Sequence, residues 1–271
     1  MSVNINNKII NIVYNESKFS VDTANYLKNK LVGLGYHVSE VFDYTADLII
    51  CIGGDGSFLR CLHQYNFPDI PIVGINTGHL GFFTEIIPDE IDEFLDKYIN
   101  NNYTIEDLIP VEASICTRTD CIQAFGINEI VIKGDKSRTI HLDISVNNQL
   151  IQRFSGDGIL VSTSTGSTAY NYSVGGSIID PNLMTLQVTP LAPINTNAYR
   201  SFTSSVILPH TANIKVNPEY HFEDSIVIVS DGMEHRYDGI TEVSLSLSEI
   251  KVKMLRLKGY QFWSKVIEKF L

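Results

Sequence analysis

The sequence predicts an α/β fold with a parallel sheet in its first part and a mostly antiparallel β fold in the rest. Strand and helix patterns alternate over residues 1–101, which is typical of a parallel sheet with right-handed crossovers. From Thr104 onward, period-two alternation and turn signals replace the helical spacing. We therefore expect an α/β domain at 1–101, a β-rich domain at 102–254, and a tail at 255–271 that packs back on the first domain.

In the first domain the helical segments are identified by their apolar spacing. Ala24, Leu27 and Leu31 recur at i, i+3 and i+7, and Pro88 is a favoured first residue for a later helix. The expected strands cover residues 8–14, 37–41, 48–52 and 71–75. The expected helices cover residues 20–31, the segment whose helical spacing begins at Phe58, and the segment that Pro88 starts.

The second domain shows strands separated by turn residues. Residues 139–146 and 150–154 alternate around Asn147-Asn148, a dipeptide typical of a tight hairpin turn. Further strand signals cover residues 225–229 and 243–257, and Asp231-Gly232 is expected to be another hairpin turn. After Gly259 the tail is rich in aromatic residues, which would be a liability if exposed.

Composition excludes several classes of protein. The 271 residues are 44% hydrophobic and 19% charged, as in an ordinary globular protein. No apolar run approaches the ~20 residues of a membrane span, and Met1–Asn4 lacks the basic start of a signal peptide. A net charge of −11 argues against nucleic acid and anionic membranes as partners, but not against a nucleotide carrying a divalent cation. We expect the four cysteines (Cys51, Cys61, Cys116 and Cys121) to be reduced thiols in a cytoplasmic protein.

A glycine-rich turn follows the apolar strand Leu48–Ile52. Gly53, Gly54 and Gly56 surround Asp55, and a helical pattern begins immediately afterwards. Such a turn directs backbone N–H groups outward at a helix start, which favours phosphate. A carboxylate beside phosphate is unfavourable unless a metal or proton donor intervenes. The position of Asp55 therefore indicates a residue that takes part in a reaction. The alternative is that Asp55 only caps the helix.

A second polar turn lies after residues 159–162. Gly156-Asp157-Gly158 precedes it, and the segment Thr163–Tyr170 offers many hydroxyl and N–H groups beside the aromatic Tyr170. Hydroxyl groups donate to phosphate, ribose or a base edge. Composition alone favours the simpler interpretation, a polar turn with a capped helix.

The first turn resembles those of NAD kinases, of diacylglycerol- and sphingosine-type lipid kinases, and of phosphofructokinases. The later segments are similar only to those of NAD kinases, of the short bacterial type. These segments are Asn76–Phe82 (Asn-x-Gly-x-Leu-Gly-Phe), Asn128-Glu129, Gly156-Asp157-Gly158 and Thr165–Tyr170.

This resemblance implies ATP-dependent phosphorylation of the adenosine ribose 2′-hydroxyl of NAD to give NADP, with Mg²⁺ or another divalent cation. It implies that Asp55 is the catalytic carboxylate and a possible metal ligand, and that the glycines at 53, 54 and 56 cradle phosphates. It also implies a homo-oligomer, a dimer of dimers, whose neighbouring subunits share the nicotinamide end of the site. The residues expected to contact NAD are Asp55, Gly56, Phe82, Asn128, Glu129, Asp157, Thr165, Thr168, Ala169, Tyr170, Ser173, Ala192 and Tyr199.

Simpler roles remain open for three of these residues. Asn128 could satisfy buried backbone groups, Glu129 could form a surface ion pair, and Phe82 could be a core residue. Ser164 stands where family members usually carry proline, and we expect its freer φ to loosen the adenine pocket. The alternative functions are a non-catalytic NAD or NADP sensor, and a related kinase acting on a lipid or sugar.

Overall fold

The computed structural model describes residues 8–79, 81–219 and 225–271. Leu80, part of the motif at 76–82, and the N-terminal segment Met1–Asn4 lie outside the described residues. The chain divides into two compact units, Met1–Leu108 with Lys251–Leu271, and Ile109–Ile250. This division differs by a few residues from the expected 1–101 and 102–254, because strands near both boundaries pair with each other in the first unit.

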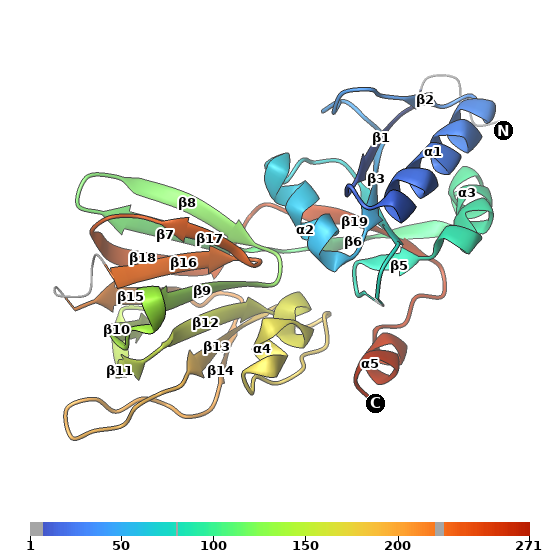
Figure 1. Cartoon of the computed structure of the whole chain (residues 1–271). Coiled ribbons are helices and arrows are strands. Elements are labelled where there is room, and N and C mark those ends of the chain that lie inside the picture. The colour runs from blue at the N-terminus through green and yellow to red at the C-terminus, as the bar shows by residue number, and fades with distance from the viewer. Residues whose placement is uncertain (1–7, 80, 220–224) are drawn as a thin grey trace. The chain divides into compact units, whose positions relative to one another are not determined.

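The first unit contains a mostly parallel sheet in the order β2-β1-β3-β4-β19-β6, with β5 beside β4 (Figure 1). All pairs are parallel except β19 with β6, which is antiparallel. The expected parallel α/β layer is therefore confirmed. The strands are β1 (Ile9–Tyr14), β2 (His37–Val38), β3 (Leu48–Gly53), β4 (Ile72–Asn76), β5 (Thr84–Ile86), β6 (Tyr103–Leu108) and β19 (Val252–Leu257).

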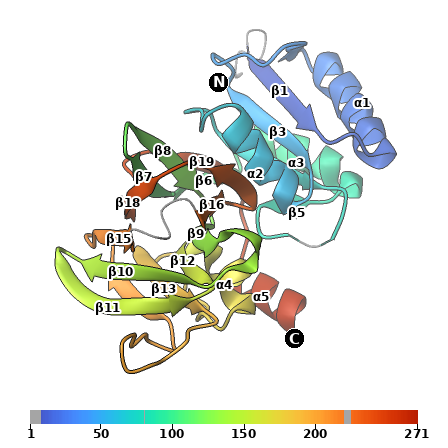
Figure 2. The ribbon, with the colours of Figure 1, turned by 60° about the vertical axis from the view of Figure 1, so that its left-hand side comes forward.

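Helices cover both faces of this sheet. Buried side chains of α1 (Lys18–Gly33) and α3 (Ile91–Ile99) share one core with alternate residues of β3, whereas α2 (Asp55–Gln64) contacts β3 outside that core. Figures 1 and 2 show α1 and α2 on opposite sides of β1 and β3. Such a layer order places the turn between β3 and α2 at the carboxyl edge of the sheet, where open α/β sheets bind ligands.

The second unit is a sandwich of two antiparallel sheets among the described residues. One sheet has the order β11-β10-β15-β18-β7-β8 and the other β14-β13-β12-β9-β16-β17. The larger of the apolar clusters in this unit takes side chains from both sheets, as in face-to-face sheet packing. The strands are β7 (Val111–Thr117), β8 (Cys121–Gly126), β9 (Glu129–Gly134), β10 (Ile140–Val146), β11 (Gln149–Gly156), β12 (Gly158–Thr163), β13 (Thr185–Leu191), β14 (Val206–Pro209), β15 (Ile214–Pro218), β16 (Ile226–Ser230), β17 (Met233–Arg236) and β18 (Ile240–Leu247).

Both expected hairpin turns are confirmed. Asn147 and Asn148 have φ of 50° and 64°, and Asp231 and Gly232 have φ of 48° and 82°, as a type I′ turn requires. The expectation of one continuous strand over 243–257 is wrong. The strand is interrupted at residues 248–251, so that β18 belongs to the sandwich and β19 to the parallel sheet.

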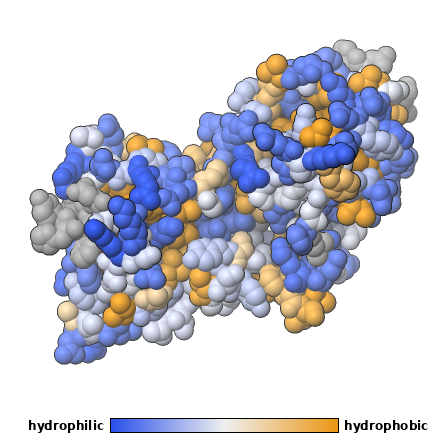
Figure 3. All heavy atoms as spheres, viewed as in Figure 1, coloured by the Kyte–Doolittle hydropathy of each residue, from blue (hydrophilic) through white to orange (hydrophobic). Residues whose placement is uncertain are grey.

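The C-terminal tail belongs to the first unit, as expected. Its helix α5 (Phe262–Phe270) places Phe262 and Phe270 near the ring of Phe82, with centroid separations of 5.8 and 6.3 Å. Trp263 and Ile267 of α5 and the following residue Leu271 are exposed. The space-filling view shows orange, hydrophobic atoms at the position of this helix (Figure 3).

The expectation of four reduced thiols is wrong for two of them. Cys116 and Cys121 form a disulfide across the β7–β8 hairpin, because the register places them directly opposite each other. Cys51 and Cys61 are free and buried. None of the helices in the described ranges combines the length and apolar character that crossing a membrane requires.

Candidate active site

The glycine-rich turn begins where β3 ends. Gly53 has no room for a side chain, because a Cβ there would lie 2.4 Å from the Ser57 hydroxyl oxygen. Gly54 is the N-cap of α2, and no side chain caps the helix. The Gly54 carbonyl accepts from the N–H groups of Ser57 and Phe58 at 2.8 and 3.1 Å. The N–H groups of Asp55 and Gly56, which precede them, have no carbonyl one turn earlier in the helix and are suited to phosphate oxygens.

Asp55 is the first residue of α2, and its carboxylate points to residues 82–84 rather than to its own helix. Oδ2 accepts from the Phe82 N–H at 2.8 Å, and Oδ1 accepts from the N–H groups of Phe83 and Thr84 at 3.0 and 3.3 Å. Oδ1 also accepts from the Thr84 hydroxyl at 3.2 Å. The helix-cap interpretation is therefore wrong. Among the described residues only the Phe82 N–H donates to Oδ2, so this oxygen can accept one more hydrogen bond.

The segment 76–84 is fitted closely around this carboxylate. A Cβ on Gly81 would lie 2.1 Å from Asp55 Oδ1, so only glycine allows the approach. The Thr77 N–H donates to the Gly53 carbonyl at 3.1 Å, which ties the segment to the glycine-rich turn. Phe82 is 7% exposed, and Lys269 Nζ lies 4.9 Å from its ring centroid, so Phe82 has the packing of a core residue in the first unit.

In the second unit, Asn128 and Glu129 stand at the start of β9, anchored by a residue distant in sequence. The Asp231 carboxylate accepts from the N–H groups of Ile127 and Asn128 at 2.8 Å each, and of Glu129 at 3.3 Å. The Asn128 side-chain amide has no hydrogen-bond partner within the described ranges. It is therefore not used to satisfy the backbone.

Glu129 is buried without a partner. Its residue is 6% exposed, and Oε2 has no hydrogen-bond partner among the described residues, so the surface ion-pair interpretation is wrong. Burial raises the pKa of Glu129 from 4.5 to about 8, and the nearby Asp231 charge adds to this effect. At neutral pH the carboxyl is therefore largely protonated and can both donate and accept a hydrogen bond.

The Ser/Thr-rich turn after β12 packs against Asn128. Gly166 allows this approach, because a Cβ there would lie 1.9 Å from the Asn128 carbonyl oxygen. The Thr163 hydroxyl donates to the Ile127 carbonyl at 2.7 Å and accepts from the Gly166 N–H at 3.0 Å. Asn128 and the start of the turn that includes Thr165 are thus brought together, and Thr168 in the same turn is buried.

Ser164 does not leave this turn loose. Its φ of −61° is close to the value that proline would impose. Its hydroxyl bonds to the Leu183 carbonyl and lies 3.0 Å from the Thr185 hydroxyl. The expected loosening is therefore corrected, because side-chain hydrogen bonds hold the loop where proline's ring would.

The residues expected at the nicotinamide end also lie in the second unit. The Asp157 N–H donates to the Leu191 carbonyl at 3.0 Å, which places Asp157 beside Ala192, whereas Ser173 ends the short helix α4 (Tyr170–Ser173). Tyr199 is half-buried, and its hydroxyl donates to Glu219 at 2.9 Å. This hydrogen bond raises the pKa of Tyr199.

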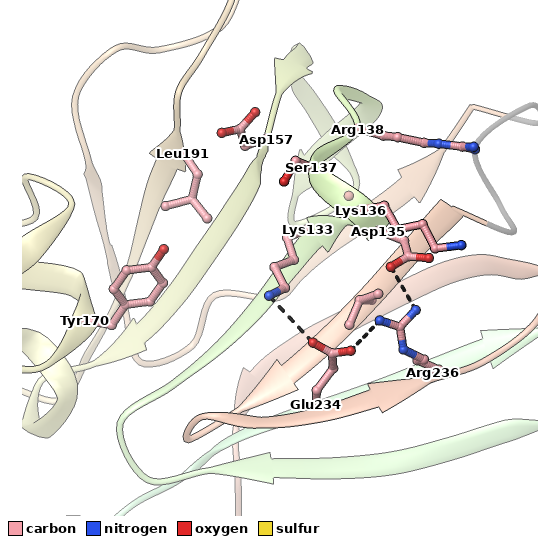
Figure 4. Close-up of a pocket in the computed structure, with 12 residues that line it drawn as sticks. Lys133, Asp135, Lys136, Ser137, Arg138, Asp157, Tyr170, Leu191, Glu234 and Arg236 are labelled. Carbon is pink, nitrogen blue, oxygen red and sulfur yellow. Dashed lines mark hydrogen bonds and ion pairs between the residues drawn. The ribbon is translucent and has the colours of Figure 1, made fainter.

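Asp157 and Tyr170 line a cavity of about 340 Å³, shown in Figure 4. Lys133 lies 3.8 Å from Glu234, which pairs with Arg236 at 2.6 Å, and Arg236 pairs with Asp135 at 2.8 Å. The cavity is thus polar and carries both signs of charge. Its lining comprises Lys133, Gly134, Asp135, Lys136, Ser137, Arg138, Asp157, Tyr170, Leu191, Val227, Glu234 and Arg236.

Sequence reasoning missed Asp231 as an anchor for Asn128 and missed the charged lining of this cavity. The Asp231-Gly232 turn signal was visible, but nothing in the sequence indicates which N–H groups its carboxylate would accept. Within the described ranges, no three His, Cys, Asp or Glu side chains are grouped as metal ligands. In the first unit, Asp55 Oδ2 accepts one hydrogen bond, from the Phe82 N–H.

Comparison with known proteins agrees with this arrangement. The chain matches family models for the ATP-NAD kinase N-terminal domain over residues 1–103 and the ATP-NAD kinase C-terminal domain over 127–257. It is 42% identical to an NAD kinase of Finegoldia magna, covering 99% of this chain and 100% of that protein. It is 28% identical to an NAD kinase of Staphylococcus aureus, covering 92% of this chain and 93% of that protein.

Two solved structures share the fold. An NAD kinase from Archaeoglobus fulgidus in complex with ATP has a TM-score of 0.76 and 26% identity, covering 96% of this chain and 98% of that one. Yeast NADH kinase complexed with NADH has a TM-score of 0.82 and 17% identity, covering 97% and 87%, and supports the fold alone. The family models and the near-full-length relative show that this chain belongs to the NAD kinase family.

Proposed function

We propose that this chain transfers the γ-phosphoryl group of ATP to the adenosine ribose 2′-hydroxyl of NAD, with Asp55 as the catalytic carboxylate. The activity follows from membership of the family. The observation that carries the assignment of Asp55 is its carboxylate geometry. Three N–H groups and one hydroxyl fix the carboxylate beside a phosphate-type turn and leave one Oδ2 lone pair for the ribose hydroxyl.

In the proposed reaction the 2′-oxygen attacks the γ-phosphorus, and the bond between that phosphorus and the bridging oxygen breaks to release ADP. Asp55 Oδ2 orients the hydroxyl and accepts its proton. Phosphoryl transfer requires mainly positioning and charge compensation, which the N–H groups at the start of α2 and the cation bound to ATP supply.

We propose that the second unit binds the dinucleotide. The Asn128 amide, which has no partner among the described residues, and the largely protonated carboxyl of Glu129 offer donors and acceptors for the adenosine end. Tyr170 is 47% exposed and offers an aromatic face, together with Thr165, Thr168 and Ala169 of the same turn. Asp157, Ser173, Ala192 and Tyr199 would address the nicotinamide end.

Three broader features are also proposed: Mg²⁺ as the cation that accompanies ATP, a cytoplasmic location where ATP and NAD are available, and a homotetramer built as a dimer of dimers. The oligomer is motivated by Asp157 and Ala192, which are exposed in one chain and would complete a neighbour's site. Light scattering across micromolar dilution tests it, and a fully active monomer would contradict it.

The activity is tested with purified protein, NAD, ATP and Mg²⁺, coupled to an NADP-specific dehydrogenase. We expect NADP to form in proportion to the protein added, and only when ATP is present. A sensor would bind NAD without producing NADP. A lipid or sugar kinase would consume ATP only with those acceptors.

A further inference from the structure

One peptide unit connects the Asp55 carboxylate to a charged side chain on its other side. The N–H of the Phe82–Phe83 peptide, which is the Phe83 N–H, donates to Asp55 Oδ1 at 3.0 Å. The carbonyl of the same peptide, on Phe82, accepts from Arg256 Nη1 at 2.8 Å. A hydrogen bond to a carbonyl polarises the peptide and strengthens the bond that its N–H donates.

Arg256 is fixed on several sides. It lies on β19 and is 6% exposed. Its Nε donates to Glu106 Oε2 at 2.6 Å, its Nη1 lies 3.5 Å from Glu85 Oε2, and its guanidinium carbon lies 3.9 Å from the Tyr260 ring centroid. These contacts hold the planar guanidinium group so that its Nη1 reaches the Phe82 carbonyl.

The charge of Arg256 is compensated within this cluster. Burial raises the pKa of Glu85, and the charge of Arg256 opposes that effect. Because a buried ion pair contributes little net stability over apolar packing, stability alone is a weak reason for placing a guanidinium here. The planar guanidinium group can donate to a carboxylate and to a carbonyl at once, in a fixed relative orientation. A lysine ammonium on a flexible stem cannot hold both acceptors in the same plane.

We propose that Arg256 is a positioning residue for the reaction, acting on Asp55 through the Phe82–Phe83 peptide. Arg256 fixes the Phe82 carbonyl, and the N–H groups of residues 82–84 fix both carboxylate oxygens. The proposal rests on the function proposed above for Asp55. It gives the C-terminal strand a role in the phosphoryl-transfer step in addition to its place in the sheet.

The test replaces Arg256 by lysine, which keeps the charge and removes the planar guanidinium group. We expect Arg256→Lys to lower kcat by about 10- to 100-fold, the range for a displaced catalytic group, with the KM for NAD and for ATP within about threefold. Amide exchange at residues 82–84 should speed up, whereas exchange along β3 should not change. Glu106→Gln, which removes only the charge that orients Nε, should give a smaller loss and serves if Arg256→Lys does not fold.

Lys251→Met is the matched control, because Lys251 forms an exposed ion pair with Asp107 between the same two strand segments. Its kcat should equal that of the wild type. Arg256→Lys added to Asp55→Asn should cause no further loss beyond about twofold, because Arg256 acts only through the carboxylate. An equal loss in both backgrounds, or a kcat within twofold of the wild type, would overturn the proposal. If the wild type produced no NADP, the proposed function would fail instead, and amide exchange at 82–84 would still decide whether Arg256 orders the segment.

Discussion

Replacing Glu129 by glutamine should stabilise the protein increasingly as the pH rises. The folded state keeps a proton on Glu129 up to about pH 8, whereas an ordinary glutamate loses it near pH 4.5. Between these values the unfolded chain binds one proton fewer than the folded chain. Stability therefore falls as the pH rises through this window, and the effect is complete above pH 8.

The expected size follows from the pKa difference. At about 1.36 kcal/mol for each pH unit, the buried carboxyl reduces the free energy of unfolding by about 3 kcal/mol at pH 7 and about 5 kcal/mol above pH 8. Glutamine keeps the shape but carries no proton to lose. Glu129→Gln should thus gain a few kcal/mol over the wild type near pH 8 and almost nothing near pH 5.

The assay must follow the second unit, because the chain's one tryptophan, Trp263, lies in the tail of the first. Native-state amide exchange of β9 and β12, corrected for the intrinsic effect of pH, reports the local unfolding free energy. Glu112→Gln on β7, at a half-buried glutamate of the same unit, is the matched control and is measured in the same way. A difference between Glu129→Gln and the wild type that stays constant from pH 5 to 8.5 would refute the reasoning.

Three further predictions concern the second unit. Asp231→Asn keeps a residue that tolerates the turn but weakens the acceptor of three N–H groups, so it should lower the free energy of unfolding by about 1–3 kcal/mol. It should also raise the KM for NAD and lower the pKa of Glu129, and an unchanged KM would contradict this prediction. Tyr170→Ala should raise the KM for NAD more than that for ATP; unchanged NAD affinity in a folded variant would argue against contact with the dinucleotide. Alkylation of protein purified in air should label neither Cys116 nor Cys121 until a reductant is added, and labelling of both without reductant would contradict the disulfide.

Local patterns were sufficient for the elements that carry the first half of the site. The apolar run at 48–52 and the glycines after it predicted β3 and the turn before α2, because strand burial and helix starts are encoded within a few residues. The hairpin turn at Asp231 was predicted for the same reason.

Contacts between distant segments could not be predicted. The Asp231 carboxylate meets an N–H group 104 residues away, and Arg256 meets a carbonyl 174 residues away. Such pairs depend on which strands become neighbours, and no local spacing specifies that. The same limit explains why Cys116 and Cys121 were expected to be reduced, since only the β7–β8 register places them opposite each other.

The central claim is that the Asp55 carboxylate acts on the ribose hydroxyl. Asp55→Asn keeps an acceptor at Oδ1, but places an amide against the Phe82 N–H, which should cost about 1–3 kcal/mol of stability. The variant should remain folded and bind NAD within a few-fold of the wild type. Asp69→Asn, at an exposed ion pair with Lys253 in the same unit, is the control and should retain full activity.

The most direct measurement is the rate of NADP formation by Asp55→Asn at saturating NAD and ATP. Loss of a positioned general base lowers the rate by about 10²–10⁴-fold, so we expect NADP formation to fall by that factor while NAD binding persists. NADP formation at a near-normal rate would show that the carboxylate is not catalytic.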